Sequence, residues 1–306
     1  MSADELLGRV EAGGLIAPPA PVVAMLSGGR DSVCMLDLAA RARGAGEVRA
    51  LHVNYGLREE ADEDERHCAA LCERLGVELV VERPRRPEGA GNLQAWARNE
   101  RYAAAARLAE GLDATIATGH TADDQVETIL YRLASSPSRR ALLGMRPKDG
   151  RLVRPLLGTT REETTAYCEE RGLPWRDDAS NEEAGYKRNL LRRNLIPELK
   201  EIHPAAVENV LRAAALLREE AGLLDSLVDA ELEAGTISQA RFAELHPALR
   251  RLVLQRLADD AAGRPVAGAA RFAEQVASLT RGGSSLDLGG GVRAVLEGGV
   301  LRAERP

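Results

Sequence analysis

The stretch "VVAMLSGGRDSVCML", residues 22–36, decides the fold of this chain. An apolar run of strand length ends at Ser27, two glycines follow, and the sequence then resumes as a helical pattern. A strand that enters a helix through a short glycine loop presents several backbone N–H groups to an anion at the helix N-terminus. The stretch therefore predicts an anion-binding loop over residues 27–32.

The side chains of this loop indicate that a metal ion accompanies the anion. The spacing fits neither the Walker loop, Gly-x-x-x-x-Gly-Lys-Ser/Thr, nor the Gly-x-Gly-x-x-Gly of dinucleotide folds. Asp31 would repel phosphate groups unless a cation intervenes, so its carboxylate implies Mg²⁺. The predicted binding residues are Ser27, Gly28, Gly29, Arg30, Asp31 and Ser32. The alternative is a plain helix cap made by Asp31 or Ser32.

The sequence around the loop alternates short β-branched runs with amphipathic stretches. Strands are predicted at residues 22–26, 48–54, 77–82 and 114–118, and helices at 32–43, 61–75, 93–110 and 122–133. This alternation is typical of an α/β fold with a doubly wound parallel sheet. From His203 onward the pattern is helical until a glycine-rich tail that looks like a small hairpin. We predict domains at residues 1–200 and 201–306, the second smaller and mainly helical.

Composition limits the class of protein. The chain of 306 residues has 44% hydrophobic and 29% charged residues, and no apolar run approaches the roughly 20 residues of a membrane span. The N-terminus lacks the pattern of a secretory signal, so we expect a cytoplasmic protein without a membrane partner. A net charge of −6 argues against a surface that is basic throughout, but residues 185–200 are locally basic. The four cysteines form no Cys-x-x-Cys pair and predict neither a disulfide framework nor a zinc site.

A second motif, "TGHTADDQVETILYRL" at residues 118–133, follows the fourth predicted strand. It places Asp123, Asp124 and Glu127 in the first turns of a helix. Both this helix start and the glycine loop lie at carboxyl ends of strands, where open α/β sheets bind ligands. We therefore expect these acids to ligate Mg²⁺ or to hold an amine. The alternative is that they only complement the helix dipole.

These motifs resemble those of known enzymes. Residues 27–32 match the Ser-Gly-Gly-x-Asp-Ser loop of the N-type ATP pyrophosphatases, the PP-loop superfamily, without a gap. "GHTADDQVET", residues 119–128, is close to the Gly-His-x-x-Asp-Asp-Gln-x-Glu-Thr signature of tRNA(Ile)-lysidine synthetases. The resemblance is nearly continuous from about Val22 to Leu199. It implies an adenine nucleotide α-hydrolase-like fold.

The resemblance also implies a reaction. The family uses ATP to adenylate the C2 carbonyl oxygen of the wobble cytidine in tRNA(Ile) with a CAU anticodon, and free lysine then displaces AMP to give lysidine. ATP and Mg²⁺ would be the cofactors, and the tRNA and free lysine the partners. The sequence is compatible with a homodimer.

We assign residues to these steps. Asp31 and Asp124 would hold the metal, while His52 and Val53 would join the loop in binding the nucleotide. The predicted catalytic residues are Asp31, Arg98, Asp123, Asp124 and Glu127. Arg98 would help to neutralise pyrophosphate, and the helix acids would attract the lysine ammonium or take its proton. Arg188, Asn189 and Arg192 would contact the tRNA, whereas for Lys200 and Arg193 a solvated helix face is the alternative.

This chain departs from the family's sequence pattern in three places. Residues 133–145 lack the family's glycines, Tyr55 replaces a histidine, and the chain ends early, which predicts a short form without the extra C-terminal tRNA-binding domain. The nearest rival is a tRNA thiolation enzyme, which usually carries a catalytic or cluster-binding set of cysteines. A non-catalytic tRNA-binding protein is a further alternative, although the intact acids and loop argue against it.

Overall fold

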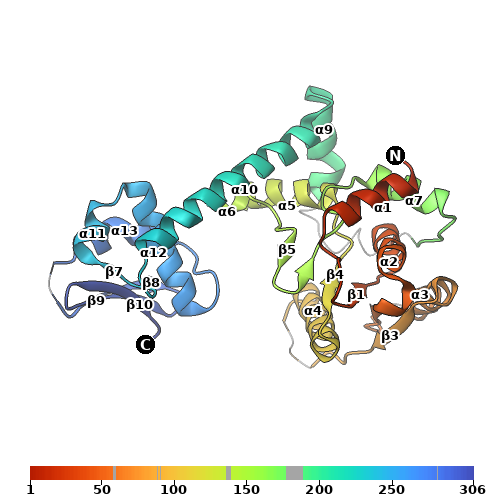
Figure 1. The fold of residues 1–306 in the computed structure, drawn as a ribbon, viewed down its shortest axis with the longest axis horizontal. Helices are drawn as coiled ribbons and strands as arrows, with labels where there is room; N and C mark the ends of the chain where they lie inside the picture. Colours follow the sequence, from red (N-terminus) through yellow and green to blue (C-terminus); the bar gives the residue numbers. More distant parts are fainter. Residues whose placement is uncertain (58–59, 88, 90, 136–138, 177–188, 281) are drawn as a thin grey trace. The chain divides into compact units, whose positions relative to one another are not determined.

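The computed structural model describes residues 1–57, 60–87, 89, 91–135, 139–176, 189–280 and 282–306. Its internal contacts divide the chain into two compact units, Met1–Ala215 and Leu216–Pro306 (Figure 1). The boundary predicted after residue 200 falls within α9 (Ile196–Ile202), in the first unit. No described helix is long and apolar enough to cross a lipid bilayer.

The first unit is built on a mixed six-stranded sheet of order β3-β2-β1-β4-β6-β5. Its strands are β1 (Val22–Met25), β2 (Val48–Val53), β3 (Glu78–Glu82), β4 (Thr115–Ala117), β5 (Lys148–Asp149) and β6 (Leu152–Val153). All neighbouring strands run parallel except β5, which pairs antiparallel with β6. In the centre Val22 pairs with both Val48 and Thr115, so β1 is hydrogen-bonded on both edges. The predicted parallel α/β sheet is confirmed.

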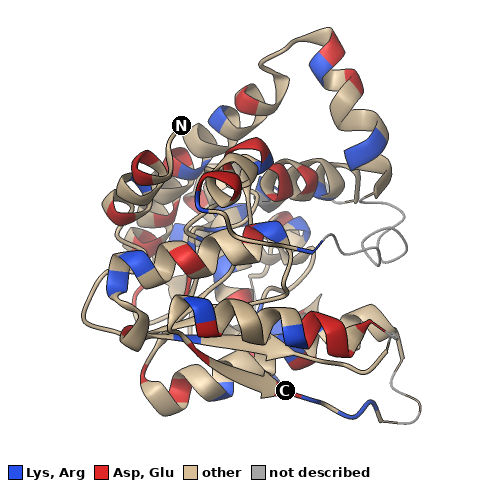
Figure 2. Cartoon of the chain, turned by 90° about the vertical axis from the view of Figure 1, so that its right-hand side faces the viewer, with Lys and Arg blue, Asp and Glu red and all other residues tan. Residues whose placement is uncertain are grey.

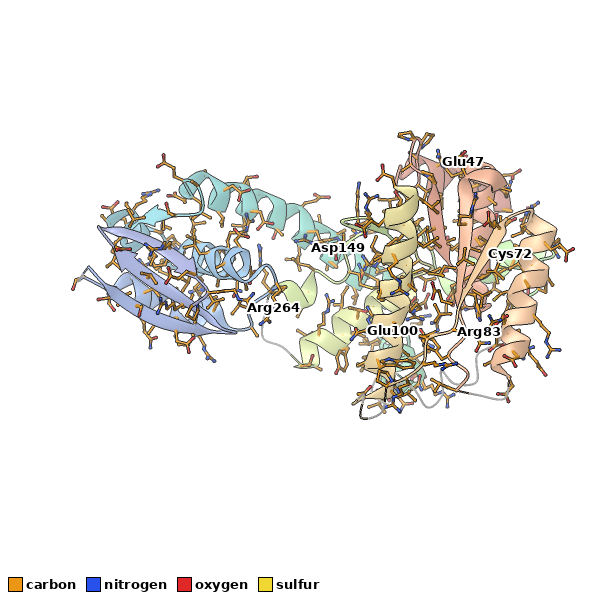
Figure 3. The ribbon with its side chains drawn as sticks, turned by 90° about the horizontal axis from the view of Figure 1, so that it is seen from below. Glu47, Cys72, Arg83, Glu100, Asp149 and Arg264 are labelled. Carbon is orange, nitrogen blue, oxygen red and sulfur yellow. The ribbon has the colours of Figure 1, made fainter. Side chains whose placement is uncertain are left out.

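Helices cover both faces of this sheet. They are α1 (Ala3–Ala12), α2 (Arg30–Arg43), α3 (Ala61–Leu75), α4 (Leu93–Leu112), α5 (Ala122–Ser135), α6 (Arg139–Leu142) and α7 (Arg161–Glu170), with a short 3₁₀ turn η1 (Ala45–Glu47). Alternate residues of β1 face opposite cores: Val22 and Ala24 pack with α1, α2, α3 and α7, whereas Val23 and Met25 pack with α4. Figure 3 shows α3, marked by Cys72, and α4, marked by Glu100, on opposite sides of the strands. The sheet is therefore doubly wound.

Helix α1 was not predicted from the sequence. Its N-terminus is closed by a capping box in which the Ser2 hydroxyl accepts from the Glu5 amide and the Glu5 carboxylate accepts from the Ser2 amide. Leu6 and Val10 are buried in the core shared with α2 and α7. The short apolar stripe of this helix gains its stability from tertiary packing, which local sequence patterns do not reveal.

The first unit ends in a run of helical segments. These are a π-helical turn η3 (Leu191–Leu195), α9, and the first residues of α10 (Ala206–Glu231). A π-helical turn widens the helix by one residue per turn and is frequent at functional sites. This turn contains Arg192 and begins two residues after Asn189, so two of the three predicted tRNA-binding residues lie at it.

The second unit is mainly helical, as predicted, and closes with a small antiparallel sheet. It contains the rest of α10, α11 (Gln239–Glu244), α12 (Pro247–Ala262), the 3₁₀ turn η4 (Ala269–Phe272) and α13 (Ala273–Ala277). The sheet order is β7-β10-β9-β8, with β7 (Ile237–Ser238), β8 (Ser284–Gly289), β9 (Val292–Glu297) and β10 (Val300–Glu304). The predicted tail hairpin was too small: Gly298 and Gly299, both at positive φ, turn the chain a second time and add a third consecutive strand.

Candidate active site

The glycine loop between β1 and α2 is shaped by its backbone. Gly28 has φ +86°, a conformation that costs a residue with a side chain about 1 kcal/mol or more. Gly29 is the N-cap of α2, and no side chain caps this helix. Asp31 and Ser32 instead lie inside the first turn, so the alternative of a plain cap made by one of these residues is wrong. The loop presents a helix N-terminus whose anion-binding geometry is already formed.

Two hydroxyl groups tie the loop together. The Ser32 hydroxyl donates to the Gly29 carbonyl oxygen at 2.7 Å and accepts from the Ser27 amide at 3.1 Å. The hydroxyl oxygens of Ser27 and Ser32 are 3.1 Å apart. The backbone of Arg176 closes the outer side, because its amide donates to the Gly28 carbonyl at 3.0 Å. The serines therefore fix the loop as well as offering hydroxyl groups to a ligand.

The two sequence motifs meet at Gly119. A Cβ atom at this glycine would lie 2.7 Å from the carbonyl oxygen of Asp31 and 3.0 Å from the amide nitrogen of Ser32. Gly119, two residues after the end of β4, thus packs directly on the first turn of α2, backbone against backbone. Only glycine allows this approach, and the glycine loop and the acidic helix consequently share one edge of the sheet.

Asp31 is held by α7, a helix that lies far away in the sequence. Its Oδ1 accepts a hydrogen bond from the Thr164 hydroxyl at 2.6 Å and from Arg30 Nε at 3.2 Å. Its Oδ2 faces Arg161, whose Nε is 3.7 Å away. The side chain of Asp31 remains 18% exposed, which leaves the carboxylate accessible beside the loop.

The first acids of α5 have two kinds of partner. Asp124 Oδ2 accepts from the amide and the hydroxyl of Thr121, so this oxygen closes the helix start, in agreement with the dipole alternative. Its other oxygen, Oδ1, faces Arg161 at 3.4 Å and Arg192 at 3.8 Å. Asp123 Oδ2 accepts from the Arg161 backbone amide at 2.8 Å and thereby fixes the start of α7. Only part of the acidic cluster therefore serves the helix itself.

Glu127 forms a two-pronged ion pair with Arg192. The guanidinium donates through Nε at 2.6 Å and through a terminal nitrogen at 3.0 Å to the two carboxylate oxygens. The Glu127 side chain is only 5% exposed. Burial lowers the pKa of Arg192, but the hydrogen bonds and charge of Glu127, with Asp124 and Asp123, raise it overall. Arg192, predicted to contact tRNA, thus lies inside the acidic cluster.

His120 lies close to Asp124 on one side and is influenced by three arginines on the other. Its Nδ1 is 2.8 Å from the Thr118 hydroxyl. Burial lowers the pKa of His120 to about 4; Asp124 opposes this, whereas Arg154, Arg98 and Arg101 lower it further. The ring is therefore neutral at physiological pH. The predicted Arg98 stacks on Tyr102, with its guanidinium carbon 4.9 Å from the ring centroid, close enough for its charge to act on His120.

The remaining predicted residues lie at various distances from this cluster. The ring of His52 is buried, and its Nδ1 lies 3.0 Å from the Leu26 carbonyl oxygen, where it braces the end of β1. Val53 ends β2 and packs toward α4. Asn189 is half-buried, and Arg188 lies outside the described residues. Their roles in binding nucleotide or tRNA stay predictions.

The donor set fits the Mg²⁺ ion that the sequence implies. Asp31 Oδ2 and Asp124 Oδ1 both face the guanidinium of Arg161, so the two carboxylates converge on one small region beside the loop. Mg²⁺ is typically held by one or two carboxylates, with phosphate and water oxygens completing its shell. Over the described residues no group of three or more His, Cys, Asp or Glu side chains is arranged around a metal position. The protein would supply two ligands and the nucleotide the others.

The cysteines argue against the thiolation alternative. All four cysteines are buried and none forms a disulfide: Cys34, Cys68, Cys72 and Cys168. A hydrogen bond to the Cys168 thiol, followed by burial, raises the pKa of Cys34, and burial raises the pKa of Cys68 to about 12 and that of Cys72 to about 11. Sulfur transfer requires an accessible thiolate, which these environments disfavour.

Sequence reasoning missed two residues of this site, Arg161 and Thr164. Both lie at the start of α7, where they contact Asp31, and Arg161 also contacts Asp124. The sequence pattern of this segment is that of an ordinary helix start. The sequence offers only a weak hint, because "RPLLGTTREETT", residues 154–165, follows β6 and so begins at the carboxyl end of a further parallel strand.

Figure 2 shows basic and acidic residues alternating along the helices that face the viewer. No single-sign field covers the helices in this view. The helices in this view are therefore not basic throughout, in agreement with the net charge of −6.

The chain is similar to known proteins over most of its length. The family model of the PP-loop domain matches residues 15–199. The chain is 38% identical over 297 residues to a tRNA(Ile)-lysidine synthase of Thermus thermophilus, covering 94% of this chain and 57% of that protein. It is 42% identical over 216 residues to the tRNA(Ile)-lysidine synthase of Pseudomonas aeruginosa, covering 68% and 48%. It thus spans about half the length of these curated relatives.

A solved structure shares the fold. The U34-tRNA thiolase NcsA from Methanococcus maripaludis aligns with a TM-score of 0.56 at 18% identity, covering 70% of this chain and 78% of that one. At this identity the likeness concerns the fold alone. It agrees with the predicted α/β architecture.

Proposed function

Because the chain belongs to the PP-loop domain family, whose model matches residues 15–199, we propose that it uses ATP to join free lysine to C2 of the wobble cytidine in tRNA(Ile) with a CAU anticodon. The products are lysidine, AMP and pyrophosphate. The relatives named tRNA(Ile)-lysidine synthases support this choice of substrate and bear out the resemblance found in the motifs. Because the chain spans only part of their length, the whole reaction is a proposal for this chain.

The observation that carries the proposal is the contact between the two motifs at Gly119. This glycine packs against the backbone of Asp31, and the side chain of Arg161 lies near both Asp31 and Asp124. A phosphate-binding loop and an acidic cluster able to attract an amine therefore lie within one small site. Activation of an oxygen by ATP and its replacement by an amine need such an arrangement.

In the first step the C2 carbonyl oxygen of cytidine attacks the α-phosphorus of ATP, and the bond to pyrophosphate breaks. The amides of the loop and the hydroxyl groups of Ser27 and Ser32 would bind the phosphates. Mg²⁺, held by Asp31 and Asp124, would neutralise charge that develops on the pyrophosphate. Arg98 supplies a further positive charge on the side of His120.

In the second step the amine of lysine attacks C2 and AMP leaves with the electron pair of the C–O bond. The amine must be neutral to attack, so a base has to take its proton. Asp123, Asp124 and Glu127 are the candidates, and neighbouring carboxylates also attract the incoming ammonium group. Glu127 is already paired with Arg192, so lysine either displaces this arginine or uses the other acids.

The proposal also covers where the reaction occurs and in what assembly. We propose that the chain acts in the cytoplasm, where a tRNA substrate would be met. The homodimer with which the sequence is compatible stays a prediction, which sedimentation equilibrium would test.

A direct experiment is incubation of the purified protein with ATP, Mg²⁺ and labelled lysine in the presence of separate tRNA species. We expect label only in an isoleucine tRNA with a CAU anticodon, with one AMP and one pyrophosphate formed per lysine. Asp31→Ala should abolish pyrophosphate release. Absence of label in that tRNA, or incorporation of sulfur without lysine, would contradict the proposal.

A further inference from the structure

The guanidinium of Arg161 occupies the space between two carboxylates of the site. Its Nε lies 3.7 Å from Asp31 Oδ2, and one terminal nitrogen lies 3.4 Å from Asp124 Oδ1. These are the two residues that fit the proposed Mg²⁺ site. All three side chains are between 18% and 24% exposed, so the charges are partly shielded from water.

The backbone around this guanidinium is fixed, but the guanidinium itself is poorly satisfied. The Arg161 amide donates to Asp123 Oδ2 at 2.8 Å, which anchors the start of α7. The Nε atom is buried and has no hydrogen-bond partner among the described residues, because 3.7 Å is too long for a hydrogen bond. One terminal nitrogen donates a long hydrogen bond to Asp124 Oδ1 at 3.4 Å, so the side chain is held by charge and by this one weak bond, which it would have to break in order to leave.

Other cations contact the same acids in a different way. Arg30 donates to Asp31 Oδ1, the oxygen that Thr164 also contacts, and not to Oδ2. Arg192 is 3.8 Å from Asp124 Oδ1 but directs its hydrogen bonds to Glu127. Arg161, by contrast, pairs with both Asp31 and Asp124 and so bridges the two carboxylates.

We propose that Arg161 is a positioning residue that takes the place of the divalent cation between Asp31 and Asp124 until the metal and nucleotide bind. This inference rests on the proposed function, which makes these two acids the metal ligands. Without a cation, two carboxylates converging on one region repel each other, and the guanidinium neutralises them. When the divalent cation enters, the guanidinium is released toward the loop, where phosphate oxygens can accept from its free Nε–H.

The proposal predicts a competition that binding of a metal alone can measure. We choose Mn²⁺ without ATP as the probe, and electron paramagnetic resonance of free Mn²⁺ as the readout. Arg161→Gln removes the competing cation, so this variant should bind Mn²⁺ about fivefold more tightly than the unchanged protein. Arg161→Lys keeps the positive charge and should stay within about twofold of it.

A matched control separates this effect from a change in net charge. Arg9 of α1 pairs at 3.0 Å with Glu163, which lies on α7 like Arg161, and it donates to the Thr159 hydroxyl; neither Asp31 nor Asp124 is among these partners. Arg9→Gln removes one positive charge near the start of α7 and should leave the Mn²⁺ affinity unchanged. Circular dichroism should show all variants folded.

Thermal unfolding provides a second readout. In chelator, Arg161→Gln should melt below the unchanged protein, because the two carboxylates are no longer neutralised. Saturating Mn²⁺ should remove most of this difference, whereas the deficit of Arg9→Gln should persist. A residue that only held α7 in place would destabilise the protein equally with and without the metal.

Two results would overturn the inference. One is a folded Arg161→Gln variant whose Mn²⁺ affinity equals or falls below that of the unchanged protein, and the other is an Arg161→Lys variant that binds Mn²⁺ as tightly as Arg161→Gln. Neither result depends on tRNA or lysine. If the metal competition is observed but no lysine reaches any tRNA, the proposed function fails while the role of Arg161 stands.

Discussion

The glycine loop and the start of α5 follow neighbouring parallel strands, β1 and β4, yet they are built in different ways. The loop is shaped by backbone: Gly28 has positive φ, and Gly29 caps α2 without a side chain. The start of α5 is shaped by charged side chains, and each of its acids already has a partner within the protein. The loop therefore has its geometry without any side-chain cap, whereas the carboxylates at the start of α5 are already neutralised or hydrogen-bonded within the protein. Under the proposed function, a metal or an amine would have to displace the arginines Arg161 or Arg192.

The largest effect should come from a substitution that disrupts the contact between the glycine loop and the residues before α5. Gly119→Ala would place a Cβ 2.7 Å from the Asp31 carbonyl oxygen, and neither backbone can move without shifting its strand or helix. We expect a loss of about 3 kcal/mol in the free energy of unfolding and no ATP-dependent pyrophosphate release. Urea denaturation and a pyrophosphate assay would measure both.

Gly111→Ala is the matched control for this prediction. Gly111 lies near the end of α4, and no atom lies within 4 Å of the position that a Cβ would take, so alanine should cost nothing there. If Gly119→Ala proved as stable and active as Gly111→Ala, the close contact of the two motifs would be refuted.

Breaking an ion pair of the acidic cluster should have the next largest effect. Arg192→Ala leaves the buried Glu127 carboxylate without its two hydrogen bonds, and we expect a loss of about 2 kcal/mol in unfolding free energy. Weaker tRNA binding should accompany this loss. Arg212→Ala, which removes an exposed pair with Glu208, should cost no more than about 0.5 kcal/mol. Equal stability of the two variants would show that Arg192 does not neutralise Glu127.

The protonation state of His120, which lies beside the acids of α5, can be tested by varying the pH. Burial lowers the pKa of His120 to about 4 in the folded protein, below its ordinary value of 6.5. Between pH 6.5 and pH 4 the unfolded chain therefore binds more protons, and stability falls as the pH is lowered through this range. His120→Asn should reduce the loss between pH 6.5 and pH 5 by about 1.5 kcal/mol, measured by urea denaturation at both values. An unchanged pH dependence in the variant would contradict the buried, neutral state of the ring.

The smallest effect on stability should distinguish strain in the loop from ligand binding. Gly28→Ala and Gly44→Ala both place alanine at nearly the same positive φ, +86° and +83°, and each should cost about 1 kcal/mol. Of the two, Gly28 has neighbours, with Cys68 Sγ 3.3 Å from an added Cβ. Because Gly28 belongs to the loop proposed to bind the phosphates and its displacement would shift the loop amides, Gly28→Ala should also raise the ATP concentration needed for half-maximal pyrophosphate release. If Gly44→Ala, at the other end of α2, raised this ATP concentration equally, the effect would come from backbone strain in general and not from the loop.

Much of the fold was predictable because its signals are local. The strands predicted at 22–26, 48–54, 77–82 and 114–118 correspond to β1, β2, β3 and β4, and no end differs by more than one residue. The helix predicted at 61–75 matches α3. Strand runs between amphipathic stretches specify a parallel sheet because each element must bury one face or stripe. The sequence reading missed α1 and the third tail strand because their stability depends on packing and on a glycine pair that also fits a simple turn.

The site was predictable only in its two continuous motifs. The loop residues and the acids of α5 are each close together in the sequence, so their chemistry could be recognised from spacing. Arg161 and Thr164 could not, because they are more than 100 residues from Asp31 in the sequence and their pattern is that of an ordinary helix start. The pairing of Arg192 with Glu127, 65 residues apart, was likewise hidden, and it moves a residue predicted for tRNA contact into the acidic cluster.

The sequence by itself determined where the chain turns and which residues follow the carboxyl ends of the strands, and it led to the prediction that phosphate and a cation bind there, since glycine conformation and the clustering of acids are local properties. Only the tertiary structure decided which carboxylates face one another and which arginines neutralise them. Ion pairs between distant segments depend on distances of a few ångströms, and these are set by how α7 packs against α2 and how the turn at η3 packs against α5.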